Sequence, residues 1–231
     1  KEATLVESKE HATEVLPDLL SSGLLGVDCE GVALGRWGRL CVCQVTTCRR
    51  VYIFDALRDG VLAAIRPVLE SRSVVKVMHD CREDSSALLS QFDTKLEGVY
   101  DTQVCHTMLR EQRVLRPFQI SLNELLRTSI GVENAHERPM GLLMKEDPNV
   151  WFYRPLHEDL VTYAAQDVMY LPLLHWWLCK ELQDPGGAQV VRRSKHYVDY
   201  ANMNLHVHSP KAVERRGLRL QAMLATRADI G

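Results

Sequence analysis

Two carboxylates close a run of residues that otherwise has the pattern of a buried strand. The run covers residues 24–30 and contains Asp28 and Glu30, two positions apart. Side chains two apart on a strand point to the same face, so both acids project together. Because like charges in an apolar setting repel each other and lose hydration, something positive must compensate them. A divalent cation is the simplest candidate.

Size and composition describe an ordinary soluble protein. The 231 residues suffice for one large domain, alone or with an appendage, and 46% are hydrophobic while 25% are charged. No apolar stretch approaches the roughly 20 residues of a membrane span, and no signal-peptide pattern opens the chain. We therefore expect no membrane partner.

The cysteines and histidines give weaker signals. Seven cysteines, an odd number, favour a reducing compartment. The spacing of Cys41 and Cys43 does not fit a zinc knuckle, so we expect them to fill strand positions. The histidines His196, His206 and His208 leave two interpretations open: a zinc site, or exposed side chains in an irregular segment, which is the favoured one.

Charge is unevenly distributed along the chain. The formal net charge is −2, but residues 184–231 carry eight Lys or Arg against four acids, which leaves −6 for residues 1–183. A protein that binds a polyanion can combine an acidic site with a basic periphery in this way. A solvated basic tail without a partner explains the same numbers.

Strand and helix patterns alternate after an antiparallel start. Strand-like runs at 24–30, 40–46 and 50–54 predict a meander, and two more strands are expected at 74–78 and 99–101. Helical patterns cover residues 8–20, 59–70, 80–92, 102–110, 121–130 and 155–182, the first closed by Pro17 and the last with a kink near Pro172. This order predicts an α/β domain with a mixed sheet.

A strong breaker, residues 184–187, follows the last helical pattern. It divides the chain into an N-terminal helical extension at 1–21, a main domain at 22–183 and a basic C-terminal extension at 184–231.

A group of acids follows the strand predicted at 74–78. Asp80 and Glu83 have the spacing of a capping box, so the start of a helix is enough to explain them. Asp84 is not needed for capping and lies one turn into the helix, where it can face the mouth of the sheet. We therefore favour Asp84 over Asp80 as a third functional acid.

An acid interrupts the apolar stripe of the last helical region. The stripe has three- and four-residue spacing and consists of Leu156, Leu160, Tyr163, Asp167, Leu171 and Leu174. An aspartate on a buried seam is costly unless it is paired. An arginine partner would explain Asp167 by itself, but together with Asp28 and Glu30 it predicts a shared site. Tyr163 lies four residues earlier on the same face.

These acids match a known pattern. The order Asp28-x-Glu30, Asp84, Tyr163-x-x-x-Asp167 is that of the DEDDy exonucleases, and the chain resembles their RNase D branch over about residues 22–182. The resemblance also extends to the residues around these acids, at 38–45, 77–79, 99–103, 151 and 154–156. The middle section is also similar to animal exonuclease-domain proteins of the piRNA pathway. Another relative with a complete acid set is the kinetoplastid mitochondrial RNase D that trims guide-RNA tails.

The resemblance implies an RNase H-like (DnaQ-like) fold, a mixed sheet flanked by helices, and a site for two divalent cations, Mg²⁺ or Mn²⁺. By analogy, Asp28 bridges both cations, and Glu30 and Asp167 hold the one that activates water. Asp84 anchors the second cation, and Tyr163 orients the attacking water. An all-carboxylate site agrees with this, because hard cations prefer carboxylate oxygens.

Five further residues are candidate substrate contacts. His79 could contact the substrate or be a core histidine, and Arg154 could bind a phosphate. Trp37 could stack on a base, as could Phe152 and Tyr153, although loop aromatics without a partner are commoner.

Other positions could support the site from behind. Asp101 and Gln103 could do so, or could only cap the helix at 102–110. Trp151 is expected to pack under the last helix.

We therefore expect a metal-dependent 3′–5′ exoribonuclease that acts on single-stranded RNA ends, alone or within a larger RNA-processing complex, and releases nucleoside 5′-monophosphates. A non-catalytic RNA-binding protein of the same fold and a DNA exonuclease remain as alternatives. The expected location is a reducing compartment: the mitochondrial matrix if the guide-RNA resemblance holds, otherwise the cytoplasm or nucleus.

Overall fold

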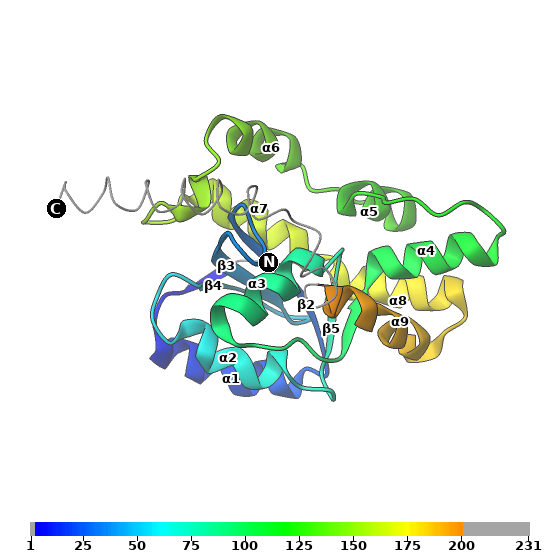
Figure 1. Cartoon of the computed structure of the whole chain (residues 1–231), viewed down its shortest axis with the longest axis horizontal. Coiled ribbons are helices and arrows are strands. Elements are labelled where there is room, and N and C mark those ends of the chain that lie inside the picture. The colour runs from blue at the N-terminus through cyan, green and yellow to red at the C-terminus, as the bar shows by residue number, and fades with distance from the viewer. Residues whose placement is uncertain (1–2, 201–231) are drawn as a thin grey trace.

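A six-stranded mixed sheet forms the centre of the computed structural model, which describes residues 3–200 (Figure 1). The strands lie in the order β1-β4-β3-β2-β5-β6. Their bounds are Ala3–Val6 (β1), Leu24–Val32 (β2), Arg39–Thr46 (β3), Val51–Asp55 (β4), Val75–Met78 (β5) and Val99–Asp101 (β6). The α/β class with a mixed sheet, predicted from the order of the elements, is confirmed.

The sheet combines an antiparallel and a parallel half. β2, β3 and β4 form the predicted antiparallel meander, whereas β5 pairs in parallel with both β2 and β6. The carboxyl ends of β2, β5 and β6 therefore meet at one edge of the sheet. In open α/β sheets this is the edge where ligands bind.

Helices cover both faces of the sheet (Figure 1). Helices α1 (Lys9–Ser21), α2 (Val61–Leu69) and α3 (Arg82–Phe92) contribute to one apolar core. The second core is formed with α4 (Thr102–Gln112), α5 (Leu122–Ile130), α6 (Glu137–Glu146), α7 (Glu158–Met169) and α8 (Leu171–Leu182). Two short 3₁₀ turns, η1 (Val150–Phe152) and η2 (Pro185–Gly187), and helix α9 (Ala188–Val198) complete the described elements.

Several elements differ from the sequence-based expectation. Helix α1 does not end at Pro17, because Val15 and Leu19 on either side of the proline are buried and hold the helix together. The pattern at 155–182 forms two helices, which meet at Tyr170, two residues before Pro172. The four-residue strand β1 and helix α6 were not predicted.

Helix α9 lies after the predicted boundary at residue 184 but packs on the sheet domain. The backbone N–H of Asp101 donates to the Ser194 hydroxyl over 3.0 Å, and the Ser85 hydroxyl donates to the Val198 carbonyl over 2.8 Å. The domain division stays a prediction, and part of the predicted C-terminal extension is packed against the fold.

His196 is exposed on α9, whereas His206 and His208 lie outside the described residues. None of the helices within residues 3–200 is long and apolar enough to cross a bilayer.

Candidate active site

Carboxylates from β2 and α7 converge at the carboxyl edge of the sheet. One oxygen each of Asp28, Glu30 and Asp167 lies within 4.8 Å of the others. Asp28 and Glu30 follow each other on one face of β2, as the two-residue period requires. The structure thus brings together side chains that are 137 residues apart in sequence.

A close approach of backbones places Asp167 over the sheet. A Cβ atom on Gly26 of β2 would lie 2.9 Å from the carbonyl oxygen of Val168 and 2.9 Å from the Cβ of Leu171. Only a glycine allows the junction of α7 and α8 to sit this low on the strand. Because Val168 is the next residue after Asp167, this contact sets the height of the carboxylate above β2.

Asp84 joins the cluster from the first turn of α3. Its side chain is buried, 5% exposed, and its Oδ1 atom has no hydrogen-bond partner. Burial is the main cause that raises the pKa of Asp84 to about 7. Burial also raises the pKa of Asp28 well above its ordinary value, and the charges of Asp84, Glu30 and Asp167 raise it further. The four acids therefore form one electrostatic unit.

The donor set fits divalent cations. Within residues 3–200, no Lys or Arg forms an ion pair with any of the four acids. The carboxylate oxygens are hard ligands, and the unpartnered Oδ1 of Asp84 is an atom that a cation would satisfy. The assignment of each acid to a particular cation stays a prediction.

Tyr163 lies beside these acids on α7. Burial raises the pKa of its phenol, and the negative charges of Asp167, Glu30 and Asp28 raise it further. The hydroxyl therefore keeps its proton at neutral pH, and it is a hydrogen-bond partner of Asp167. The ring of Trp151, which is buried as expected, lies 6.1 Å from the ring of Tyr163.

Asp101 supports the start of α3 from the end of β6. Its carboxylate accepts hydrogen bonds from the backbone N–H groups of Asp80 and Cys81, at 3.1 and 2.8 Å. It also accepts from the N–H groups of Gln103 and Val104 at the start of α4. Asp101 thus caps α4, as one interpretation expected, and also fixes the turn that precedes Asp84.

The predicted capping box of Asp80 and Glu83 is wrong. Asp80 has a positive φ of 53° and pairs with Arg82, and the N-cap position belongs to Cys81, which makes no side-chain cap. The turn takes this shape because Asp101 already binds the backbone N–H groups there. The favoured choice of Asp84 over Asp80 agrees with the position of Asp84 in the cluster.

Two candidate substrate contacts have hydrogen-bond partners within the fold, and their role toward substrate stays a prediction. The ring nitrogens of His79 are bonded to the Thr102 hydroxyl, at 2.8 Å, and to the Ile120 carbonyl, at 2.9 Å. Arg154 makes two bonds of 2.7 Å to the buried carboxylate of Asp55. Its remaining donors bind the carbonyl oxygens of Trp151, Tyr153 and Cys41.

The remaining candidates from the sequence are exposed to different degrees or have partners within the fold. Trp37 is 51% exposed in the β2–β3 loop, so its role in base stacking stays a prediction. Tyr153 is 37% exposed and Phe152 is half-buried. The amide of Gln103 donates to the Phe118 carbonyl at 3.1 Å and accepts from the Ile120 N–H at 2.8 Å, which holds the segment after α4 in place.

The sequence analysis did not predict two amide side chains that lie at the site. Gln44 lies opposite Asp28 on β3 and donates to its Oδ2 atom over 3.3 Å. Asn134, between α5 and α6, donates to Asp167 Oδ1 over 2.7 Å. The alternation along β3 could have placed Gln44 beside Asp28, but nothing in the sequence links Asn134 to a residue 33 positions away.

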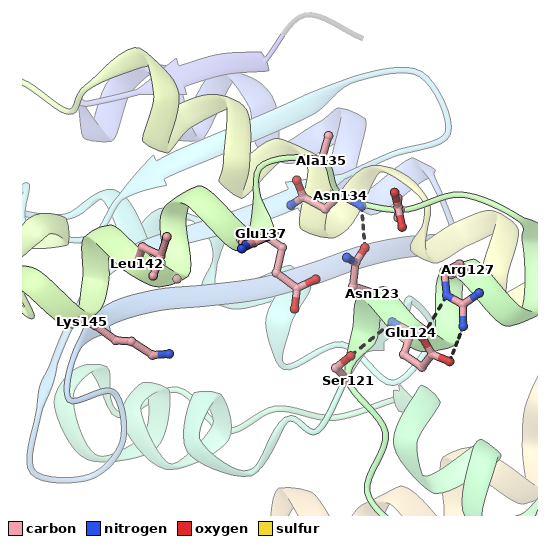
Figure 2. A pocket seen from close by; sticks show the side chains of 12 residues that line it. Ser121, Asn123, Glu124, Arg127, Asn134, Ala135, Glu137, Leu142 and Lys145 are labelled. Atoms are coloured by element: carbon pink, nitrogen blue, oxygen red, sulfur yellow. Dashed lines mark hydrogen bonds and ion pairs between the residues drawn. The ribbon is translucent and has the colours of Figure 1, made fainter.

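A pocket of about 650 Å³ lies between α5 and α6 (Figure 2), and Asn134, the donor to Asp167, connects it to the acids. Asn134 and Glu137 both line the pocket. Burial is the main cause that raises the pKa of Asp167, and the charge of Glu137 raises it further. The other lining residues are Ser121, Asn123, Glu124, Arg127, Glu133, Ala135, Arg138, Gly141, Leu142 and Lys145. The pocket has the size of a small-molecule site and is largely polar.

Comparison with known proteins places the chain in a family. Residues 3–183 match the family described as 3′-5′ exonuclease. The chain belongs to this family. It is 32% identical over 169 residues to the human piRNA biogenesis protein EXD1, and the aligned region covers 69% of this chain and 33% of that protein. It is 28% identical over 188 residues to ribonuclease D of Gluconacetobacter diazotrophicus, which covers 79% of this chain and 44% of that protein.

Solved structures agree with this assignment. The RNase D–GMP complex of Trypanosoma brucei superimposes with a TM-score of 0.76 at 25% identity, over 86% of this chain and 64% of that chain. RNase D of Escherichia coli, at 18% identity, shares the fold with a TM-score of 0.73 over 87% of this chain and 51% of that chain. The RNase D-type family and the RNase H-like fold predicted from the acids are thus confirmed. The chain spans about a third of the length of its mammalian EXD1 relatives.

Proposed function

We propose that this exonuclease-family protein is a metal-dependent 3′–5′ exoribonuclease that trims single-stranded RNA ends and releases nucleoside 5′-monophosphates. The observation that carries the proposal is the convergence of Asp28, Glu30 and Asp167, joined electrostatically by Asp84, with no basic side chain paired to them within residues 3–200. Such a cluster is suited to hold cations against a phosphodiester.

The acids of the cluster would hold two divalent ions, Mg²⁺ or Mn²⁺. Glu30 and Asp167 would bind one, Asp84 the other, and Asp28 both. When bound, such ions supply a hydroxide at neutral pH and stabilise the leaving oxygen of the phosphodiester.

The chain's own groups then position the reactants. The protonated hydroxyl of Tyr163 is available to hydrogen-bond and orient the attacking water. Asp101 keeps the first turn of α3, and with it Asp84, in place. The pocket between α5 and α6 offers the preceding nucleotides a polar surface with Arg138 and Lys145 for their phosphates. That RNase D of T. brucei forms complexes with GMP and with the RNA U12 supports RNA as the substrate class.

The similarity to piRNA biogenesis proteins favours a second candidate function. In this alternative, the chain binds RNA without cleaving it, as a component of a larger RNA-processing complex. DNA as the substrate is a third alternative, because recognition of the 2′-hydroxyl depends on local contacts.

An RNA-degradation assay separates these candidates. RNA and DNA of one sequence, labelled at the 5′ end, are incubated with the protein and Mg²⁺ or Mn²⁺, and Asp84→Asn serves as the inactive control. The proposal expects a ladder of shortened RNA that a 3′-phosphate blocks. Intact RNA would support the binding role, and a ladder from DNA alone would support a DNA exonuclease. The reducing compartment stays a prediction, which imaging of the tagged chain would test.

A further inference from the structure

Asn134 connects the pocket to the carboxylate cluster. The residue lies between α5 and α6 and is buried, 4% exposed. Its side-chain Nδ2 donates to Asp167 Oδ1 over 2.7 Å and to the Tyr163 carbonyl over 3.3 Å. Its Oδ1 accepts from the backbone N–H of His136 over 2.9 Å. All polar atoms of this amide are therefore engaged, and one of them is engaged with a candidate metal ligand.

The position of Asn134 is itself fixed. Its backbone N–H donates over 2.6 Å to the side-chain oxygen of Asn123 on α5 (Figure 2). The amide thus reaches Asp167 from a segment anchored at both its backbone and its side chain. A donor held in this way restricts the rotation of the carboxylate it binds.

We propose that Asn134 is a positioning residue, which orients the carboxylate of Asp167 for cation binding. The inference rests on the proposed function in so far as Asp167 serves as a metal ligand there. Asp167 differs in this respect from Asp84, whose Oδ1 has no partner, and from Asp28, whose bond from Gln44 is longer at 3.3 Å. The amide of Asn134 fixes one oxygen of Asp167 over 2.7 Å, and the Tyr163 hydroxyl is a second hydrogen-bond partner of the same carboxylate.

A neutral donor serves this purpose better than a charged one. A Lys or Arg in place of Asn134 would neutralise Asp167 and compete with a cation for it. The amide supplies a hydrogen bond without removing the negative charge of the cluster. Groups that orient metal ligands from behind change metal affinity or activity by about 10- to 100-fold when they are removed.

The test replaces Asn134 by Leu, which has a similar size but no donor. We expect the Asn134→Leu variant to bind Mn²⁺ about 10- to 100-fold more weakly in titration calorimetry. Its kcat on RNA should fall by a similar factor at a fixed Mn²⁺ concentration, with KM changed by less than about threefold, because Asn134 acts through Asp167 rather than on substrate. Asn149→Leu, the same exchange in the segment before η1, is the matched control and should keep wild-type Mn²⁺ affinity.

The melting temperature separates positioning from a purely structural role. If Asn134 orients Asp167, the rise in melting temperature that Mn²⁺ produces should be smaller in Asn134→Leu than in the wild type. A drop of equal size with and without Mn²⁺, or unchanged Mn²⁺ affinity, would overturn the inference. If the wild type binds Mn²⁺ but cleaves no RNA, the proposed function fails, while the comparison of Mn²⁺ affinities still decides the role of Asn134.

Discussion

At the scale of single residues, two buried aspartates have opposite surroundings. Asp84 is 5% exposed and its Oδ1 lacks a partner, whereas the fully buried Asp101 accepts four backbone N–H bonds. We predict that Asp84→Asn abolishes nuclease activity yet stabilises the metal-free protein at pH 8, by up to about 4 kcal/mol, because it removes a charge that burial disfavours. Thermal unfolding in EDTA measures the effect.

Asp101→Asn is the matched control for this prediction. The new amide would place donors against backbone N–H groups, so we expect a loss of roughly 1–3 kcal/mol in the same assay. Equal destabilisation by both exchanges would show that Asp84 has a structural role and not a functional one.

The pH dependence of stability gives a second prediction for Asp84. Burial raises its pKa from 3.8 to about 7, so between these values the folded state holds a proton that the unfolded state has lost. Stability from this group therefore falls as pH rises through that window, and the loss is complete above about pH 7. The wild type and Asp84→Asn should melt at similar temperatures near pH 4 in EDTA. The wild type should fall progressively below the variant up to pH 7, and a constant gap across this range would contradict the assigned pKa.

At the scale of secondary-structure elements, the sequence pattern predicted an element correctly where the pattern extended over enough residues to show its period. The meander β2–β4 and helices α2, α4 and α5 follow from alternation, three- and four-residue spacing and turn residues. β1 is too short to show a period, and its position depends on pairing with β4, whose paired residues lie 48 positions away. The turn at Asp80 was mispredicted because its shape depends on Asp101, which local spacing does not reveal.

The residues of the candidate site also fall into two groups: those that the sequence pattern reveals and those that only the fold reveals. Asp28, Glu30, Tyr163 and Asp167 could be found because each acid, or the phenol, interrupts an apolar periodic pattern. His79 bonds to a side chain 23 residues away, Asn134 to one 33 residues away and Arg154 to one 99 residues away, and only the folded chain shows these hydrogen bonds.

The end of α4 provides a prediction about backbone conformation. Val114 has a φ of 56° and is 93% exposed, and the N–H of the following Leu115 donates to the Arg110 carbonyl over 2.8 Å. This is the helix end at which glycine is favoured, because the left-handed conformation strains a β-branched residue. We expect Val114→Gly to stabilise the protein by up to about 1 kcal/mol in urea unfolding.

The mirror exchange is the control for Val114. Gly131 ends α5 with a φ of 71°, and a Cβ there would meet nothing within 4 Å. Gly131→Val should therefore destabilise through backbone conformation alone. If both exchanges changed stability in the same direction, side-chain contacts rather than φ would be responsible.

At the scale of the whole molecule, the parallel strands separate two edges of the sheet. Their carboxyl ends carry the acids and adjoin the pocket with Arg138 and Lys145. The segments that lead into β5 and β6 lie at the opposite edge and carry Arg72 and Lys95. If RNA runs through the pocket, only the first pair of cations should contact its phosphates.

Salt dependence of RNA binding tests this arrangement. Each phosphate contact to a single strand changes the slope of log K against log salt concentration by about 0.7. In the non-cleaving Asp84→Asn background, replacing Arg138 and Lys145 by Gln should weaken binding of a single-stranded RNA and make the slope shallower by up to about 1.4. The equivalent double exchange of Arg72 and Lys95 removes the same charge and should leave the slope unchanged. An equal loss in both double variants would mean that net charge, rather than a defined path across the pocket, attracts the RNA.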